Sequence, residues 1–191
     1  MEETNRRDAR ELMLELDAHC AERMKGDELA LARKAMAFAK NAHEGQKRDS
    51  GEPYIIHPVM VAEMLLDMGM DANTVIAGLL HDVVEDCQGV TVDMLAREFG
   101  ADIAEMVDGV TKLTKTGKSD ILGKEEAQAE NLRKMFLAIA KDVRVVIIKL
   151  TDRLHNMRTL EYCKTEKQQR KAREVLDVYA PLASRFGMGA I

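Results

Sequence analysis

Residues 81–86 combine an imidazole with three carboxylates, the side chains most able to bind a metal and move a proton. If this segment is helical, residues four apart share a face, so His81 lies over Glu85 and Asp82 lies over Asp86. The carboxylates would repel one another unless a cation lay among them. A divalent metal ion supplies such a cation and also acts as a Lewis acid. The spacing therefore predicts a metal site that carries out a reaction.

Two other segments of the chain supply further candidate ligands. His57 comes directly before a proline, and Asp152 follows the apolar run 143–150. Together with His81 and Asp82, they form an ordered set of two imidazoles and two carboxylates. Each of these residues is commonplace alone, but the ordered set favours a metal site. This donor mixture suits Mn²⁺, Fe²⁺ or Zn²⁺ better than a metal that prefers thiolates.

The other three histidines lack comparable neighbours in the sequence. We expect His19 and His43 to lie on the surface or to support other residues. His155, three residues after Asp152, is a candidate to orient a metal ligand from behind.

Phosphorus chemistry suits the predicted site. A metal ion can polarise a phosphoryl oxygen and activate water, and a nearby carboxylate can orient or deprotonate that water. Cations beside the metal would neutralise the charge of a phosphorylated substrate. Such cations flank the predicted ligands on both sides, at Lys47, Arg48, Arg153 and Arg158. Each is ordinary alone, but two groups that each flank a ligand favour phosphate binding.

Composition limits the possible classes of protein. The chain has 191 residues, 46% of them hydrophobic and 32% charged, which is enough for one domain with a core. A net charge of -5 and 4% aromatic residues argue against a general nucleic-acid binder. The three separated cysteines predict neither a disulfide framework nor a thiolate zinc site. With no apolar signal region or membrane-length run, we expect a cytoplasmic protein.

The apolar spacing is helical nearly throughout and predicts an all-α protein. We expect helices at residues 10–24, 27–42, 57–68, 72–85, 92–99, 101–110, 124–141, 143–160 and 166–184. Asp27, Asp71 and Thr91 are the expected N-caps of three of them. The β-branched start of 143–160 permits a strand, but the apolar run continues unbroken and favours a buried helix. Pro181 is expected to kink or end the last helix. Residues 111–124, with four lysines, are either a solvated linker or a mobile loop near an anionic ligand.

Four segments, taken in order, resemble the HD-type hydrolase domain of the Rel/SpoT family, the long bifunctional alarmone synthetase–hydrolases of bacteria. They are residues 42–58, 80–86, 107–113 and 149–160. The resemblance covers the chain from about Ala30. Residues 179–188 resemble the segment where this hydrolase domain meets the synthetase domain. The resemblance implies an N-terminal helical extension at 1–26, an HD hydrolase domain at 27–180 and the start of a linker at 181–191.

The resemblance also implies a fold and an activity. The fold is an all-α HD-domain helical bundle with one Mn²⁺, held by His57, His81, Asp82 and Asp152. The activity is removal of pyrophosphate from the 3′ position of guanosine tetra- and pentaphosphate, giving GDP or GTP. Family catalytic residues fall on Glu85 and Asp86, and nucleotide contacts on Arg48, Ser50, Asn156 and Thr159. The charge argument adds Lys47 and Arg153 to the substrate-binding candidates.

The resemblance extends to partners and includes two departures. We expect no membrane contact and no direct nucleic-acid binding, with ribosome contact reserved for C-terminal regions of full-length family members. Asp49 stands where many relatives carry a basic or neutral residue, which removes a cation from that position. Cys87 stands where threonine is usual, with little expected effect.

Two alternatives compete with alarmone hydrolysis. The same site could act on another phosphorylated nucleotide, although the segment resembling the family's linker argues against this. The chain could instead sense an alarmone without turning it over, although the intact Glu85 and Asp86 argue against that. We hypothesise that residues 111–124 take part in switching between active and inactive states.

Overall fold

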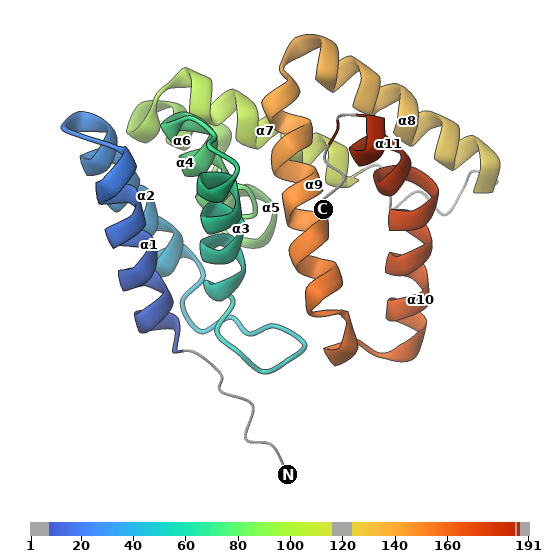
Figure 1. Ribbon diagram of the computed structural model, residues 1–191, viewed down its shortest axis with the longest axis horizontal. Helices are drawn as coiled ribbons and strands as arrows, with labels where there is room; N and C mark the ends of the chain where they lie inside the picture. The colour runs from blue at the N-terminus through green and yellow to red at the C-terminus, as the bar shows by residue number, and fades with distance from the viewer. Residues whose placement is uncertain (1–7, 116–123, 186, 188–191) are drawn as a thin grey trace.

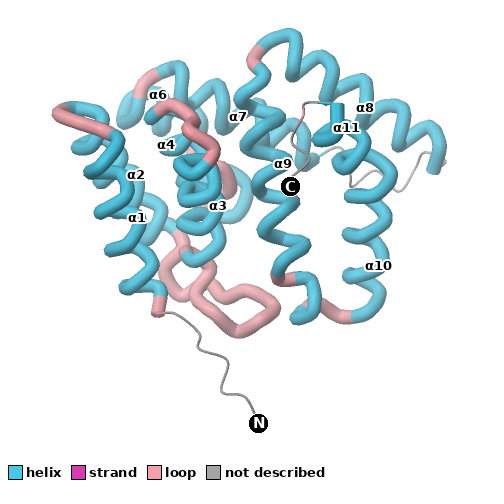
Figure 2. The backbone as a smooth tube through the Cα atoms, in the orientation of Figure 1, coloured by secondary structure: helices cyan, strands magenta, loops and turns pink. Residues whose placement is uncertain are grey.

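The computed structural model describes the backbone of residues 8–115, 124–185 and 187. It describes the side chains of the same residues except those within 114–132. Helices follow one another along this part of the chain, and its sole β pairing is an isolated bridge between Lys47 and Pro53 (Figure 2). The predicted all-α class is confirmed. The helices are α1 Ala9–Arg23, α2 Asp27–Ala42, α3 Ile56–Asp67, α4 Ala72–Leu80, α5 Val83–Asp86, α6 Val92–Phe99, α7 Ala101–Lys115, α8 Lys124–Lys141, α9 Val143–Arg158, η2 Leu160–Tyr162, α10 Thr165–Glu174, the π-helical η3 Val175–Tyr179 and α11 Ala180–Arg185.

The central helices are α3, α4, α7 and α9 (Figure 1). Helix α3 packs against α1, α4 and α9, while α4 also contacts α2 and α7. Helices α1 and α2 form one side of the molecule, and α8, α10 and α11 form the other (Figure 1). The first turn of α3, the end of α4 and the later turns of α9 therefore come together in the interior.

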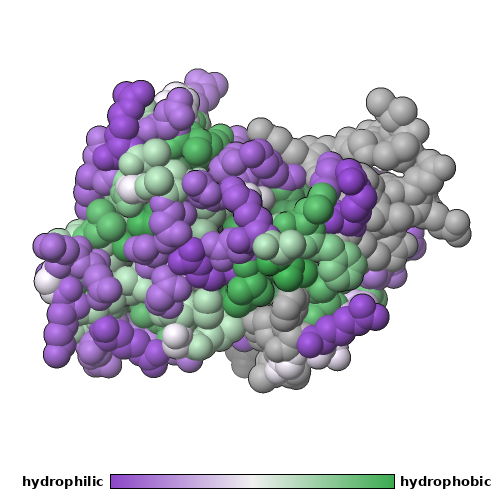
Figure 3. Space-filling model, turned by 90° about the horizontal axis from the view of Figure 1, so that it is seen from above, coloured by the Kyte–Doolittle hydropathy of each residue, from purple (hydrophilic) through white to green (hydrophobic). Residues whose placement is uncertain are grey.

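The outer surface mixes polar and apolar residues. Seen from above, apolar patches alternate with polar side chains (Figure 3). Large apolar side chains with substantial exposure include Leu14, Phe136, Leu137 and Leu176. Within the described residues, no helix is both long and apolar enough to cross a membrane.

Local capping signals set the start of several helices. Asp71 caps α4, because its Oδ1 accepts a hydrogen bond from the backbone N–H of Thr74 at 3.1 Å. Thr91 caps α6 in the same way. Asp27 was expected to cap α2, but it is the first helical residue, and Gly26 precedes it with φ +57°. A carboxylate in the first turn still complements the helix dipole.

Two glycines allow the central helices to approach closely. A Cβ on Gly78 of α4 would overlap the side chain of Leu65 on α3. A Cβ on Gly109 of α7 would crowd Val145 on α9, at 2.9 Å. These glycines bring α4 and α7 against their neighbours.

Helix α9 confirms the helical interpretation of the β-branched run. Its buried face begins with Val145 and Ile148 and continues, at spacings of three or four, to Asp152 and His155. The stripe that packs α9 into the core thus carries two polar residues into the interior.

The predicted helix over 72–85 is interrupted. Helix α4 ends at Leu80 and α5 begins at Val83, with His81 and Asp82 in a turn between them. The backbone carbonyl of Asp82 accepts from the N–H groups of both Glu85 and Asp86, at 3.1 and 2.9 Å. These bonds begin α5, so the segment expected to be one helix forms two.

The predicted loop 111–124 begins later than expected. Helix α7 continues to Lys115, since Leu113 remains buried and the Thr111 hydroxyl donates to the carbonyl of Val107 at 3.0 Å. Residues 116–123 lie outside the described residues, as do 1–7 of the expected extension and 186 and 188–191 of the expected linker. The division into extension, domain and linker remains a prediction; within its first segment, Leu16 and Cys20 of α1 belong to the core.

The last helix passes through Pro181 after a π-helical turn. The backbone N–H of Ala180 bonds to the carbonyl of Val175, five residues earlier. Proline lacks an N–H, so the wider turn before it accommodates the missing bond. Pro181 therefore deforms the helix ahead of itself and does not end it.

Candidate metal centre and substrate-binding loop

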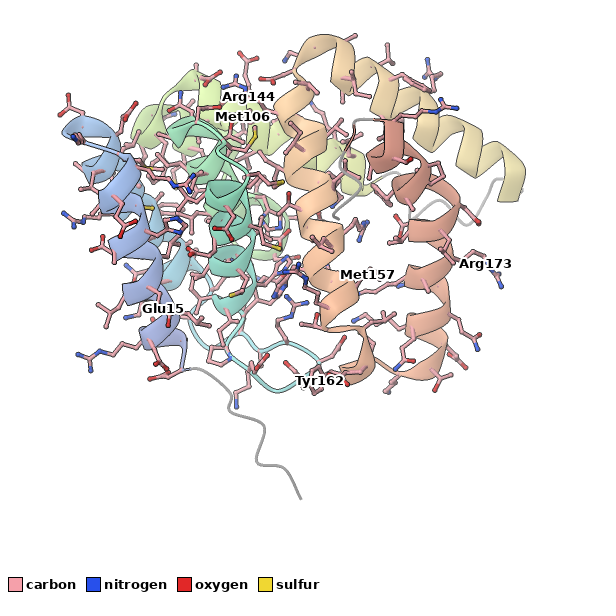
Figure 4. All side chains as sticks on the ribbon, viewed as in Figure 1. Glu15, Met106, Arg144, Met157, Tyr162 and Arg173 are labelled. Atoms are coloured by element: carbon pink, nitrogen blue, oxygen red, sulfur yellow. The ribbon has the colours of Figure 1, made fainter. Side chains whose placement is uncertain are left out.

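The four predicted metal ligands meet between α3, α4 and α9. His57 Nε2 lies 3.2 Å from Asp152 Oδ1 and 3.5 Å from Asp82 Oδ2, and His81 Nε2 lies 3.1 Å from the same Asp82 oxygen. Ligand atoms from His57, His81 and Asp152 all lie within 4.8 Å of one another, and these three residues are buried. His57 belongs to α3 and Asp152 to α9, and side chains fill the space between these two helices (Figure 4).

His81 directs its Nε2 atom toward the cluster. Its Nδ1 lies 2.7 Å from the carbonyl oxygen of Gly78, which can only accept, so Nδ1 carries the hydrogen. Nε2 is a buried atom without a hydrogen-bond partner among the described residues. Burial alone would lower the pKa of His81, but the Asp82 carboxylate raises it to about 9, so a metal ion that binds Nε2 must displace a proton from it. Such a nitrogen beside the Asp82 carboxylate is a ready metal ligand.

Neighbouring residues set the tautomer of His57. The Arg48 guanidinium, which can only donate, lies 3.3 Å from His155 Nδ1, so that nitrogen accepts. His57 Nδ1 lies 2.7 Å from the same nitrogen, and when it donates there the lone pair of His57 is on Nε2, which faces Asp82 and Asp152. Burial lowers the pKa of His57 and, together with His57, lowers the pKa of His155 to about 3. The prediction that His155 supports a ligand from behind matches this contact.

The geometry fits one divalent metal ion. Nitrogen and oxygen ligands lie about 2.1 Å from such an ion, so neighbouring ligands are about 3 Å apart. The separations of 3.1 to 3.5 Å between the imidazole nitrogens and the carboxylate oxygens match this value. Two imidazoles and two carboxylates therefore form a candidate centre for a divalent metal.

Protein cations compensate only part of the negative charge. Burial alone would raise the pKa values of Asp82 and Asp152, but the imidazoles lower the first and Lys149 lowers the second. Lys149 Nζ donates to Asp152 Oδ2 at 2.8 Å, and its side chain is 2% exposed. One ammonium beside a buried and a partly buried carboxylate leaves room for a further cation. Lys149 was not singled out from the sequence, although a lysine three residues before a buried aspartate can reach it within one helical turn.

Tyr54 is a second residue that sequence reasoning missed. Its hydroxyl lies 2.8 Å from Asp82 Oδ2 and 2.8 Å from Asp86 Oδ2. Burial and both carboxylates raise the pKa of Tyr54, while burial and Asp82 raise the pKa of Asp86. Asp82 and Asp86 do lie on one side, as predicted, but across a turn and with a phenol between them. The position of Tyr54, three residues before His57, was the available signal.

The predicted substrate-binding cations begin in the loop 46–54. The backbone N–H of Tyr54 bonds to the carbonyl of Gln46, and that of Arg48 to the carbonyl of Glu52. Gly51, at φ +84°, makes the tight turn between them. Lys47 is exposed, and the Ser50 hydroxyl donates to Glu52 at 2.9 Å.

The structure brings together three of the predicted nucleotide-binding residues. Arg48 donates from Nη2 to Asn156 Oδ1 at 3.0 Å and to Thr159 Oγ1 at 3.2 Å. Asn156 in turn donates to Asp152. The loop, the end of α9 and the metal centre thus form one connected polar network.

Arg153 and Asp49 make contacts with the C-terminal helices. Arg153 pairs with Glu174 at 3.1 Å and lies over the ring of Tyr179 at 5.1 Å, so its described contacts differ from the predicted substrate contact. Asp49 accepts from Lys167 Nζ at 2.6 Å and from the Cys163 thiol at 3.2 Å. The acidic residue at position 49 therefore joins the loop to α10. His43, expected on the surface or in support, is buried against Tyr54, and Glu85 is partly buried in α5.

Comparisons with known proteins point in one direction. The family model described as HD domain matches residues 35–189. A protein of Vibrio cholerae named guanosine-3′,5′-bis(diphosphate) 3′-pyrophosphohydrolase is 54% identical over 82% of this chain, which is 22% of that relative. The bifunctional (p)ppGpp synthase/hydrolase SpoT of Escherichia coli is 51% identical over 85% of this chain and 22% of its own length. A GTP pyrophosphokinase of Myxococcus xanthus is 49% identical over 86% of this chain and 22% of its own length.

The chain spans about a fifth of the length of these curated relatives. A solved structure resembles it with a TM-score of 0.59 and 26% identity, over 78% of this chain and 85% of that one. Its title describes a metazoan ortholog of SpoT that hydrolyses ppGpp and has a role in starvation responses.

Proposed function

Because this chain belongs to the HD domain family, we propose that it removes pyrophosphate from the 3′ position of guanosine tetra- and pentaphosphate, giving GDP or GTP. The convergence of two imidazole nitrogens and two carboxylates in one buried cluster carries this proposal. The name of the Vibrio cholerae relative specifies guanosine 3′,5′-bis(diphosphate) and that of the Escherichia coli relative specifies (p)ppGpp, and these names suggest the substrate.

Two observations favour hydrolysis over synthesis, since the relatives' names include both activities. The ligand cluster and its adjacent carboxylates suit the activation of water. The solved structure that resembles this chain corresponds to it over 85% of its own length, and its title reports ppGpp hydrolysis. The shared region is therefore the best candidate for the hydrolytic part of the longer relatives.

We infer that the ion is Mn²⁺, held by His57, His81, Asp82 and Asp152. The choice of Mn²⁺ follows the resemblance to the Rel/SpoT family, while the donor set supports a divalent ion in general. When bound, the ion supplies Lewis-acid chemistry at a phosphoryl oxygen and at water.

Glu85 and Asp86 are the proposed residues for handling water. Burial and Asp82 raise the pKa of Asp86, which makes its carboxylate a stronger base than an ordinary aspartate. Water adds to the phosphorus bonded to the 3′ oxygen, and the bond between that phosphorus and the 3′ oxygen breaks. The water oxygen leaves in pyrophosphate, and the 3′ oxygen takes up a proton.

The nucleotide is proposed to bind Lys47, Arg48, Ser50, Asn156 and Thr159, with Arg153 contributing positive charge behind Asp152. Arg48 is suited to stack on the guanine, and Asn156 has donors and an acceptor for a base edge. Arg48 is bonded to Asn156 and Thr159 in this structure, so nucleotide binding must replace some of those bonds.

Other aspects of the function follow from the same resemblance. We propose a cytoplasmic enzyme, in keeping with three cysteines that form no disulfide. Contact with the ribosome, expected through C-terminal regions of full-length family members, and the absence of direct nucleic-acid binding remain predictions.

The decisive assay uses metal-stripped protein and guanosine tetraphosphate, with and without Mn²⁺. We expect Mn²⁺-dependent release of GDP and pyrophosphate in equal amounts. Asp152→Ala, treated identically, should release neither. If the unaltered protein neither hydrolyses nor binds the tetraphosphate, the substrate assignment is wrong. Binding without turnover under all metals tested would instead support a sensing module.

A further inference from the structure

One hydroxyl group lies between a proposed metal ligand and a proposed catalytic carboxylate. Tyr54 Oη is 2.8 Å from Asp82 Oδ2 and equally far from Asp86 Oδ2. The same Asp82 oxygen lies 3.1 Å from His81 Nε2 and 3.5 Å from His57 Nε2, so it is the oxygen that faces the ligand cluster. Tyr54 therefore connects the cluster to Asp86.

A phenol has one proton to donate and two carboxylates compete for it. If Asp82 Oδ2 served as a metal ligand, this oxygen would be a weaker hydrogen-bond acceptor, because the ion would withdraw its electron density. The stronger acceptor for the phenol proton is then Asp86 Oδ2, which faces no imidazole nitrogen among the described contacts. The hydrogen bond would thus hold the Asp86 carboxylate beside the ligands.

Other contacts fix the positions of Tyr54 and Asp86 relative to each other. The ring of Tyr54 stacks on His43, with centroids 4.6 Å apart and planes inclined by 23°. The carbonyl of Gln46 accepts from the Tyr54 N–H at 3.0 Å, and Gln46 Nε2 donates to the backbone carbonyl of Asp86 at 2.9 Å. Gln46 therefore anchors the backbone of both residues, while the phenol reaches the Asp86 side chain.

We propose that Tyr54 is a positioning residue whose hydroxyl holds the Asp86 carboxylate in place beside the metal ligands. The role in turnover rests on the proposed hydrolase function, whereas the placement of Asp86 does not. The residue acts through Asp86 and leaves the ligand set itself intact.

The kinetic test compares Tyr54→Phe with Tyr162→Phe, a control that removes a phenol hydroxyl from a residue that is 38% exposed. Loss of a supporting hydrogen bond at such a site typically costs about 10- to 100-fold. We expect kcat of Tyr54→Phe to fall by this factor, with KM and the calorimetric Kd for Mn²⁺ within about threefold of those of the unaltered protein. The phenyl ring keeps its stack on His43, so thermal melting should change little. An unchanged kcat, or a loss of Mn²⁺ affinity equal to the loss of rate, would overturn the proposal.

A double variant tests whether Tyr54 acts through Asp86. If it does, Tyr54→Phe should have no further effect in an Asp86→Asn background. A full additional loss there would assign the hydroxyl to another role and overturn the proposal.

A readout independent of turnover is the position of the carboxylate in crystal structures of the unaltered protein and Tyr54→Phe. We expect the Asp86 side chain to leave its site in the variant while His57, His81 and Asp152 stay in place. An unmoved Asp86 would overturn the proposal. If the unaltered protein shows no hydrolysis, the proposed function fails, and this comparison alone decides whether Tyr54 positions Asp86.

Discussion

Two groups of carboxylates, at different positions along α9, contact different kinds of protein cation. Near the N-terminal end, Arg144 donates to both Asp142 and Asp102, with its shortest bonds at 2.7 Å (Figure 4). Further along the helix, Lys149 is the one ammonium among the described contacts of Asp152, to which Asn156 also donates, while Asp82 and two imidazole nitrogens face the same space. Each group thus has one such cation for two carboxylates, a planar guanidinium that bonds both in the first group and an ammonium that bonds one in the second.

The two groups also differ in the exposure of their charged side chains to water. The side chains of Arg144 and Asp102 are 28% and 48% exposed, so water stabilises what the guanidinium leaves uncompensated. Those of Lys149 and Asp152 are 2% and 5% exposed, where an uncompensated charge is far more costly. The comparison teaches that burial, and not the number of carboxylates or of cations, distinguishes the candidate metal centre from a surface ion network.

Removal of a buried ligand should have the largest effect. We expect Asp152→Ala to weaken Mn²⁺ binding by more than about 100-fold and to abolish hydrolysis, since it removes a carboxylate that faces His57. Calorimetry on metal-stripped protein measures this loss, and Asp152→Asn repeats it with the side-chain shape retained. Asp102→Ala, which removes a carboxylate from the Arg144 network, should bind Mn²⁺ normally. Normal affinity in both Asp152 variants would remove Asp152 from the ligand set.

Glu85→Gln separates chemistry from metal binding. We expect kcat to fall by about 100- to 10,000-fold, because the variant loses a carboxylate that orients or deprotonates water. Mn²⁺ and nucleotide affinity should remain close to normal. Glu105→Gln, an exposed carboxylate paired with Lys141, is the matched control. Rates close to normal in Glu85→Gln would transfer the role to Asp86.

Lys149→Met tests how strongly the buried cluster depends on its one ammonium group. Breaking a buried ion pair costs about 3 to 5 kcal/mol, so the metal-free variant should lose about this much free energy of unfolding. Saturation with Mn²⁺ should recover part of the loss, because the ion also compensates Asp152. Urea unfolding with and without Mn²⁺ gives both values, and Lys141→Met, at an exposed ion pair, is the control. An equal loss in both forms would mean that Lys149 stabilises the fold by packing alone.

Arg144→Gln should have the smallest effect. Partly exposed ion pairs contribute little, so we expect a loss of about 1 kcal/mol in the free energy of unfolding and an unchanged Kd for Mn²⁺. The Asp142 side chain still caps α9 by accepting from the backbone N–H of residue 144. Urea unfolding and calorimetry measure the two quantities. A loss as large as that of Lys149→Met would invalidate the distinction between the two ends of α9.

Local signals predicted many of the elements closely. The helices expected at 27–42 and 124–141 have those bounds, and the Asp71 and Thr91 caps were identified correctly. Each of these features depends on residues within one or two helical turns. The end of α7 was wrong because Leu113 is buried by distant parts of the chain and extends the helix through a lysine-rich segment.

In the candidate site, too, local features were predicted and contacts between distant segments were not. The ordered set of histidines and aspartates was sufficient to predict a two-imidazole, two-carboxylate cluster, and the structure brings its members together. Tyr54 had no assigned role, because its two carboxylate partners lie 28 and 32 residues further along the chain. The contact between Arg48 and His155, which are 107 residues apart, could not be predicted from the sequence either.

The sequence by itself determined the donor types, the helical class and most helix starts, because side-chain chemistry and capping act within a few residues. The tertiary structure alone decided which nitrogen of each histidine faces the cluster, that Tyr54 stands between Asp82 and Asp86, and that Lys149 is buried against Asp152. These features depend on how closely α3, α4 and α9 pack. Close-packed contacts between distant segments set distances that no local pattern specifies.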